Sequence, residues 1–360
     1  MNKVGILPLQ YCKPGMRIGR DITVNENVIV HYSSEITSPL LDDFFKNNIS
    51  EVPILLTGHA QMIYDDYKIG KSYEQCMTEY ELDYKKMIHE LKDIFINCNF
   101  TYDKISAFTE FLTANLEKIN NDSIFSCVDG IRDVDEYLYT HSINVAMLAW
   151  LMGSWIDLSE QDKYDLVMAG ILHDIGKTKI DKKIMMKSTA FDAPEICIIK
   201  KHPHYGYEIL NSIPEMKAEI KDAVYSHHEK INGSGYPRGL QGDEISKKAR
   251  ILAICDIYDA MMANKVYRPR QSSFHVFDVF MNDKLNRNLD YDLVTLFLNK
   301  ISGKFMGKNV RLSNNLLGKI IFMNPIDYSR PVVQLDNEII DTSASNTFIV
   351  DIIDTVTELQ

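Results

Sequence analysis

The sequence gathers histidines in its central part. Six of the ten histidines lie between positions 141 and 228, and His227 and His228 stand just before the glycine-rich turn GSGYP at residues 233–237. Adjacent imidazoles suit a packed core poorly and a metal site well, because each neutral ring offers a nitrogen lone pair to a cation. We therefore expect a metal here. A lone histidine such as His141, on an apolar helical stripe, is more simply explained as a hydrogen-bonded core residue.

Two aspartates add carboxylates to this pattern. Asp174 directly follows His173 at the end of a helix predicted over residues 163–177, and Asp256 lies in a small, apolar helix predicted over residues 249–263. An ionised carboxylate is costly to bury among apolar residues unless a cation or strong donors receive it. A metal ion meets this demand at both positions. At Asp256, a helix cap or a salt bridge to a neighbour is the alternative.

The order of these residues resembles that of a known family. His141, the pair His173 and Asp174, and then Asp256 follow the H, HD, D order of the HD superfamily of metal-dependent phosphohydrolases. Five segments also resemble, in order, the HD-GYP family of cyclic di-GMP phosphodiesterases: HDIGK from residue 173, HP from 202, HHE from 227, GSGYP from 233 and ARILAICDIYDAM from 249. The resemblance spans roughly residues 100–300 and implies an extended, helical HD fold.

The resemblance implies two divalent metal ions with a shared carboxylate. The ligands of one would be His141, His173, Asp174 and Asp256, and those of the other would be Asp174, His202, His227 and His228. Imidazole and carboxylate ligands without thiolate favour iron, manganese or zinc over magnesium and calcium, and we expect iron or manganese. Relatives with a third metal carry a glutamate four residues before the first histidine. This chain has Tyr137 there and Glu136 one step out of phase, so we expect two metals.

The resemblance also implies residues that contact the substrate. Lys177 lies three residues after Asp174 and would bind a phosphate or leaving oxygen, although a surface lysine is the plain alternative. Gly235 allows the backbone to approach a ligand closely, and Tyr236 would contact a guanine face or a phosphate unless its ring packs inward. Two cationic positions follow at Lys265 and Arg268. The family tends to have arginine at both, and a lysine cannot reproduce the two-pronged hydrogen bonding of an arginine.

The implied activity is hydrolysis of cyclic di-GMP to pGpG by a metal-bridging hydroxide, with further hydrolysis to GMP left open. Asp174 and Lys177 would be the catalytic residues. One alternative is a catalytically weak cyclic-dinucleotide sensor or adaptor that acts through protein partners. Another is oxygen activation by a di-iron HD protein, and a third is preference for pGpG or a related cyclic dinucleotide.

The elements that must position these residues predict a mainly α fold with small strand-containing ends. We expect an α+β accessory domain at residues 1–65, a helical linker at 66–100, a catalytic domain at 101–308 and a β-rich extension at 309–360. MRIGRDITV, NVIVHY and EVPILL in the first domain have strand-like patterns, and TSPLLDDFFK begins a helix that Thr37 or Ser38 can cap. Helical spacing then continues until strands return near residue 310.

Composition excludes several other classes of protein. The net charge of −11 argues against binding of a nucleic acid polymer, because no basic patch releases counterions. No apolar run of about 18 residues predicts a membrane span, and the first residues lack the pattern of a signal peptide, so we expect a cytoplasmic protein. The six cysteines have no regular spacing and are expected to be reduced. The helices between residues 73 and 120 would pair two subunits, relay a signal to protein partners, or pack within the chain.

Overall fold

The structure is a computed structural model of the 360-residue chain. It describes residues 3–9, 12–24, 27–47, 49, 51–57, 60, 64, 83–96, 100–118, 124–125, 128, 137–185, 187, 189–263, 273–282, 288–336 and 338–353. The chain divides into two compact units, Met1–Leu82 and Asp83–Gln360. Residues 83–96, which the sequence places in a linker, are helical and belong to the second unit in this division.

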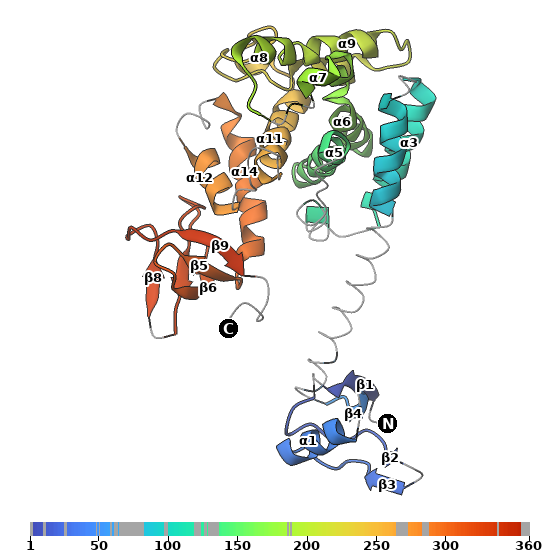
Figure 1. The fold of residues 1–360 in the computed structure, drawn as a ribbon, viewed down its shortest axis with the longest axis vertical. Helices are drawn as coiled ribbons and strands as arrows, with labels where there is room; N and C mark the ends of the chain where they lie inside the picture. The colour runs from blue at the N-terminus through green and yellow to red at the C-terminus, as the bar shows by residue number, and fades with distance from the viewer. Residues whose placement is uncertain are drawn as a thin grey trace. The chain divides into compact units, whose positions relative to one another are not determined.

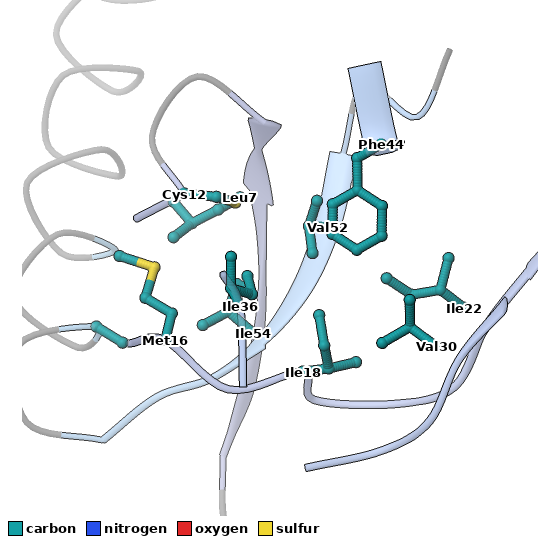
Figure 2. Close-up of a cluster of buried hydrophobic side chains, with 11 residues drawn as sticks. Leu7, Cys12, Met16, Ile18, Ile22, Val30, Ile36, Phe44, Val52 and Ile54 are labelled. Atoms are coloured by element: carbon teal, nitrogen blue, oxygen red, sulfur yellow. The ribbon is translucent and has the colours of Figure 1, made fainter. Parts of the chain in front are cut away.

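The first unit is a small α+β structure. Its elements are β1 (Val4–Pro8), β2 (Ile22–Val24), β3 (Asn27–Val30), α1 (Ser38–Lys46) and β4 (Glu51–Leu55). β1 pairs antiparallel with β4, and β2 pairs antiparallel with β3. Thr37 caps α1, because its side chain accepts a hydrogen bond from the backbone N–H of Leu40 at 3.4 Å. Apolar side chains from all of these elements meet in one core, which Figure 2 shows.

The strand expected from MRIGRDITV is shorter in the structure. Only Ile22–Val24 forms a strand, while Arg17 and Ile18 make isolated bridges to Glu35 and Ile54. Ile18 is fully buried. The apolar pattern thus predicted which residues are buried but not where regular pairing stops.

The second unit is mainly helical, and the expected fold class is confirmed. Figure 1 shows α5 and α6 side by side at its centre. The helices and turns are α3 (Tyr102–Leu116), α5 (Tyr137–Trp155), α6 (Glu160–Leu172), η2 (Ile175–Lys179), α7 (Lys182–Met185), α8 (Ala193–Ile199), α9 (His202–Asn211), α10 (Ala218–Ser226), η3 (Gly242–Glu244), α11 (Lys247–Met262), α12 (Ser273–Met281), α14 (Tyr291–Ser302) and η4 (Gly303–Phe305).

Helix α5 is the central element of this unit. Every residue from Thr140 to Gly153 is buried, because α6 and α11 both pack against it. Gly170 lets α6 approach closely, since a Cβ there would lie 2.8 Å from the Cα of Ala146. This close approach brings the end of α6 to the side of α5.

A second close approach joins η2 to α9. A Cβ on Gly176 would lie 1.9 Å from the backbone oxygen of His202 and 2.5 Å from the backbone nitrogen of Gly206. Only glycine fits this crossing without moving one of the two backbones. The turn that follows His173 is therefore held directly against the start of α9.

The C-terminal extension is a five-stranded antiparallel sheet, as the strand-like pattern predicts. Its strands are β5 (Asn309–Leu312), β6 (Leu317–Phe322), β7 (Val332–Gln334), β8 (Ile339–Asp341) and β9 (Ile349–Ile353), in the order β8-β7-β6-β5-β9. The first four strands form a meander, and β9 returns to pair with β5. Val310, Ile320 and Val333 are buried on adjacent strands, so one face of the sheet forms a core.

Candidate metal centre

The predicted metal ligands come from five helices and meet in one place. Most of them stand at helix ends: His173 closes α6, Asp174 precedes η2, His202 begins α9, and His227 closes α10. The others are His141 on α5, Asp256 on α11 and His228, which directly follows His227. Residues 115 positions apart in sequence thus share one site.

One group of ligands consists of His141, His173 and Asp174, with Asp256 at its side. The Nε2 atoms of His141 and His173 are 3.2 Å apart, and Oδ2 of Asp174 lies 3.6 Å from the first and 3.4 Å from the second. Oδ1 of Asp256 lies 3.1 Å from His141 Nε2. Four potential ligand atoms therefore converge on one point.

The other group consists of His202, His227 and His228. The Nε2 atoms of His202 and His227 are 3.2 Å apart, and Oδ1 of Asp174 lies 3.2 Å from His202 Nε2. Asp174 therefore turns one oxygen toward each group, which is the arrangement that a bridging carboxylate needs.

Hydrogen bonds on the far side of three rings fix which nitrogen faces the centre. Nδ1 of His173, His202 and His227 lies 2.8, 2.8 and 2.7 Å from the carbonyl oxygen three residues earlier. A carbonyl only accepts, so each Nδ1 carries the proton and donates it, and a neutral ring then presents a bare lone pair at Nε2.

Facing lone pairs give the centre the donor set that a cation site needs. The Nε2 atoms of His202 and His227 face each other at 3.2 Å, and with both protons on Nδ1 no hydrogen bond can join them. Asp174 Oδ1 is buried and accepts no hydrogen bond from the described residues. A divalent ion satisfies both the lone pairs and this oxygen, so the residues present fit a metal.

The protonation states of the site also suit cation binding. Burial raises the pKa of Asp174, but Lys177 and the neighbouring histidines outweigh burial and hold the pKa well below its ordinary value. The pKa of Asp256 is likewise well below its ordinary value, because His141 and other histidines outweigh burial. Burial lowers the pKa of His202 to about 3 and that of His228 to about 4. Burial likewise holds the pKa of His227 well below its ordinary value. At His141, burial is outweighed by hydrogen bonds to Asp256 and Asp259, which raise the pKa to about 9. A metal bound at Nε2 of His141 would displace that proton.

The GSGYP turn lies directly against the centre. The ring of Tyr236 stacks on His228 with 4.7 Å between centroids, and its backbone N–H donates to the carbonyl oxygen of His228 at 3.2 Å. A Cβ on Gly235 would lie 2.5 Å from the Cα of Glu229, so glycine is needed for the turn to fold back on the HHE segment. The two residues predicted for substrate binding in this turn therefore lie beside a predicted metal ligand.

The other residues named from the sequence are Lys177, Tyr137, Lys265 and Arg268. Lys177 Nζ contacts Oδ2 of Asp174, and its side chain is 19% exposed, so it belongs to the centre and reaches the surface. Tyr137 stacks on the ring of His141 with 5.3 Å between centroids. Lys265 and Arg268 lie outside the described residues.

Comparison with known proteins agrees with this geometry. Residues 126–292 match the family described as HD domain. This range contains every predicted metal ligand. This part of the chain is similar to HD domains, and curated proteins named as cyclic di-GMP phosphodiesterases are about 30% identical to it. The recognition made from the five sequence segments is confirmed.

Two curated relatives of this HD-domain chain show the kind of protein it is similar to. It is 30% identical over 191 residues to the cyclic di-GMP phosphodiesterase PA4108 of Pseudomonas aeruginosa, covering 53% of this chain and 46% of that protein. It is 29% identical over 221 residues to the 3'3'-cGAMP-specific phosphodiesterase 2 of Vibrio cholerae, covering 61% and 41%. The chain thus spans less than half the length of these relatives.

A solved structure shares the fold of this HD-domain chain. It is Bd1817, an HDG"Y"P protein from Bdellovibrio bacteriovorus, with a TM-score of 0.54 and 14% identity, covering 84% of this chain and all of that one. Within the described ranges, none of the helices has the length and apolar character to span a membrane.

Three residues of this HD domain were not predicted from the sequence. Asp259 accepts a hydrogen bond from Nδ1 of His141 at 2.7 Å. Glu229, 3% exposed, accepts from the backbone N–H groups of Arg238 and Leu240 at 2.6 and 3.0 Å, so it holds the chain that leaves the GSGYP turn. Lys200 lies over the ring of Tyr236 at 5.2 Å. The sequence signals for two of them were available in the motifs themselves: Glu229 is the E of HHE, and Asp259 is the second D of DIYD.

Proposed function

We propose that this chain is a metal-dependent phosphodiesterase that hydrolyses cyclic di-GMP to pGpG, with further hydrolysis to GMP left open. The observation that carries the proposal is the buried, ionised Asp174, whose two oxygens face two separate groups of histidine nitrogens. Relatives that are named as cyclic di-GMP and 3'3'-cGAMP phosphodiesterases support a cyclic dinucleotide as the substrate.

The two ligand groups support a pair of metals. We assign one ion to His141, His173, Asp174 and Asp256, and the other to Asp174, His202, His227 and His228. Nitrogen and oxygen ligands without thiolate favour iron or manganese. When bound, the metal pair activates water and offsets the charge that develops on the phosphoryl group.

Lys177 is proposed to bind a non-bridging oxygen of the scissile phosphate. An ammonium group has three donors, and the contact with Asp174 occupies one of them. The remaining N–H groups can turn to a phosphate oxygen beside the metals. There they stabilise the negative charge of the transition state more strongly than that of the ground state.

Tyr236 and Gly235 are proposed to form a platform for a guanine base. The Tyr236 ring stacks on His228 on one side, and the residue is only partly buried. An aromatic face of this kind stacks on a nucleobase at about 1–3 kcal/mol per base. Lys265 and Arg268 are proposed to contact the phosphates.

The local charge near the centre supports an anionic ligand despite the acidic chain. Residues 177–201 contain seven lysines against three acidic residues. This segment begins at Lys177 and ends at the residue before His202, so its positive charge lies next to the metal ligands. Such a local field attracts a phosphodiester even when the net charge of the protein has the opposite sign.

A substrate panel tests the proposal. Full-length protein loaded with iron or manganese under anaerobic conditions is given cyclic di-GMP, 3'3'-cGAMP and pGpG, and products are separated by chromatography. We expect metal-dependent release of pGpG from cyclic di-GMP. Faster hydrolysis of 3'3'-cGAMP would instead support that substrate, and tight binding without turnover would support a sensor. Turnover that requires oxygen would indicate the wrong reaction class.

Lys177→Ala with Lys179→Ala as its control tests the assigned lysine. Both lysines lie in η2, but Lys179 is exposed and Lys177 contacts Asp174. We expect the first change to lower kcat by about 100-fold, in line with loss of one charge-stabilising donor, and the second to leave kcat within twofold. Equal effects of the two changes would refute the role of Lys177.

We also propose a cytoplasmic location, homodimer formation, and roles for the flanking parts in signalling. Among the described residues, Cys197 and Cys255 form no disulfide, which supports a reducing compartment. The accessory domain at residues 1–65 and the extension at 309–360 are proposed as the parts that receive a signal or bind protein partners. Sedimentation of the full chain measures the oligomeric state, and a monomer at micromolar concentration would contradict the dimer.

A further inference from the structure

A buried chain of hydrogen bonds leads from the start of the second unit to a metal ligand. The hydroxyl of Tyr84 donates to Oδ1 of Asn144 at 2.7 Å, and Nδ2 of Asn144 donates to Oδ1 of Asp259 at 3.0 Å. Oδ2 of Asp259 accepts from Nδ1 of His141 at 2.7 Å. These four residues are between 0 and 2% exposed, so water does not compete for their bonds.

We propose that Tyr84, Asn144 and Asp259 form a positioning relay that holds His141 for metal binding and couples the helix at residues 83–96 to the metal centre. The proposal rests on the proposed function, because it assumes that His141 binds a metal. It adds a route by which another part of the chain can act on that metal.

The direction of the hydrogen bonds supports a positioning role. Because Oδ1 of Asn144 accepts from Tyr84, the amide of Asn144 is oriented with its nitrogen toward Asp259. The carboxylate of Asp259 is then fixed with its other oxygen toward His141 and can only accept. A neutral His141 therefore keeps its proton on Nδ1, and Nε2 is left for the metal. A carboxylate in this place also makes the imidazole a stronger ligand.

His141 differs from the other ligands in how it is held. His173, His202 and His227 each donate Nδ1–H to a backbone carbonyl of the helix that they close. Those bonds are local and persist as long as each helix does. The Nδ1 of His141 is held instead by Asp259 of α11, 118 positions away. Its orientation therefore depends on tertiary packing and responds when another element moves.

The position of Tyr84 identifies the helix at residues 83–96 as the element whose movement would reach His141. Tyr84 lies in the first turn of the helix at residues 83–96, one residue after the unit begins at Asp83. A rotation of this helix would withdraw the hydroxyl, which also lies 3.4 Å from the carbonyl oxygen of Thr140. The amide of Asn144 would then lose the partner that orients it.

Manganese binding to the full-length, metal-free protein tests the relay without depending on turnover. Asp259→Asn keeps the volume of the side chain and removes the charge, and Tyr84→Phe removes only the hydroxyl. We expect Asp259→Asn to raise the dissociation constant of one of two Mn²⁺ ions by about 10- to 100-fold, the usual effect of losing such a partner. Tyr84→Phe should raise the same constant by about two- to tenfold, as loss of a neutral hydrogen bond implies.

Two control variants match these changes elsewhere in the unit. Asp165→Asn removes a buried carboxylate that pairs with Lys217 at 2.9 Å. Tyr164→Phe removes a hydroxyl that lies 2.9 Å from Oγ of Ser106. Neither residue contacts a predicted metal ligand through the bonds described, and we expect both controls to leave both Mn²⁺ constants within twofold.

The outcomes separate the relay from the proposed function. The relay would be overturned if the Asp259→Asn and Tyr84→Phe proteins bound two Mn²⁺ ions with wild-type dissociation constants. It would also be overturned if the controls lost as much Mn²⁺ affinity as these two variants. Circular dichroism checks folding, and Tyr84→Phe decides the matter if Asp259→Asn does not fold. Two Mn²⁺ ions bound by a wild type without phosphodiesterase activity would refute the proposed function alone. A wild type that binds no Mn²⁺ would refute both.

Discussion

The substitution Gly176→Ala should separate the two halves of the metal centre. Its Cβ would lie 1.9 Å from the backbone oxygen of His202, whereas ordinary van der Waals contact begins at 3.4 Å. The two backbones must therefore move apart by about 1.5 Å. No rotation of a side chain can relieve the overlap, because the atoms that meet the new methyl group belong to the backbone of α9.

This movement acts directly on the proposed bridging ligand. Asp174 lies two residues before Gly176, and its Oδ1 is 3.2 Å from Nε2 of His202. A shift of about 1 Å in a catalytic group can cost on the order of 100-fold in rate, so we expect kcat to fall at least that far. Overpacking costs about 1–3 kcal/mol, which would lower Tm by roughly 2–12 °C for a unit of this size.

Metal content measured by elemental analysis, activity and thermal unfolding are the assays. We expect Gly176→Ala to lose close to one metal per chain while remaining folded at 25 °C. Gly303→Ala is the matched control, because a Cβ there meets no atom within 4 Å and the backbone is helical. A Gly176→Ala protein with wild-type metal content and activity would refute the argument that this crossing sets the distance between Asp174 and His202.

The remaining predictions concern other parts of the centre. Asp174→Ala should abolish both metal binding and activity, whereas Lys177→Ala should keep the metal, as elemental analysis can show; a metal-free Asp174→Ala protein with full activity would end the assignment. Glu229→Gln leaves one backbone N–H of the turn without its acceptor. It should raise KM for cyclic di-GMP by about tenfold, since a hydrogen bond to a charged group is worth about 1.5–3 kcal/mol, with metal content unchanged. An unchanged KM would contradict a role of Glu229 in holding the GSGYP turn in place for the substrate. Chelation should lower Tm reversibly, because a metal at 100 times its Kd stabilises the fold by about 2.7 kcal/mol; a Tm that does not respond to added Mn²⁺ would contradict a structural contribution of the metals.

The sequence by itself determined the chemistry of the site. Ligand identity depends on residue type, and the order of the histidines and aspartates is visible along the chain without any folding. Adjacency also carried information, since the pairs His173–Asp174 and His227–His228 must lie close together in any fold. Helical periodicity and the return of strand-like patterns near residue 310 were likewise enough to predict a mainly α chain with a β-rich end.

The tertiary structure decided how the ligands meet. Gly170 and Gly176 could be any turn or helix glycine in the sequence, because a close crossing involves backbone atoms from distant segments. The boundary at Leu82 and Asp83 also depends on packing, since the helix at residues 83–96 has the same periodicity whether it spans a linker or joins a core.

Asp259 shows most clearly what the sequence could not predict. Its neighbour Asp256 was predicted as a ligand, and both lie on α11. Only the structure shows that Asp259 accepts a hydrogen bond from Nδ1 of His141, whereas Asp256 faces Nε2 of the same ring. A sequence states which groups can bind a cation, because that property belongs to each side chain. Which group touches the cation and which one orients a ligand is decided by distances of a few ångströms between helices, and those arise only when the helices pack.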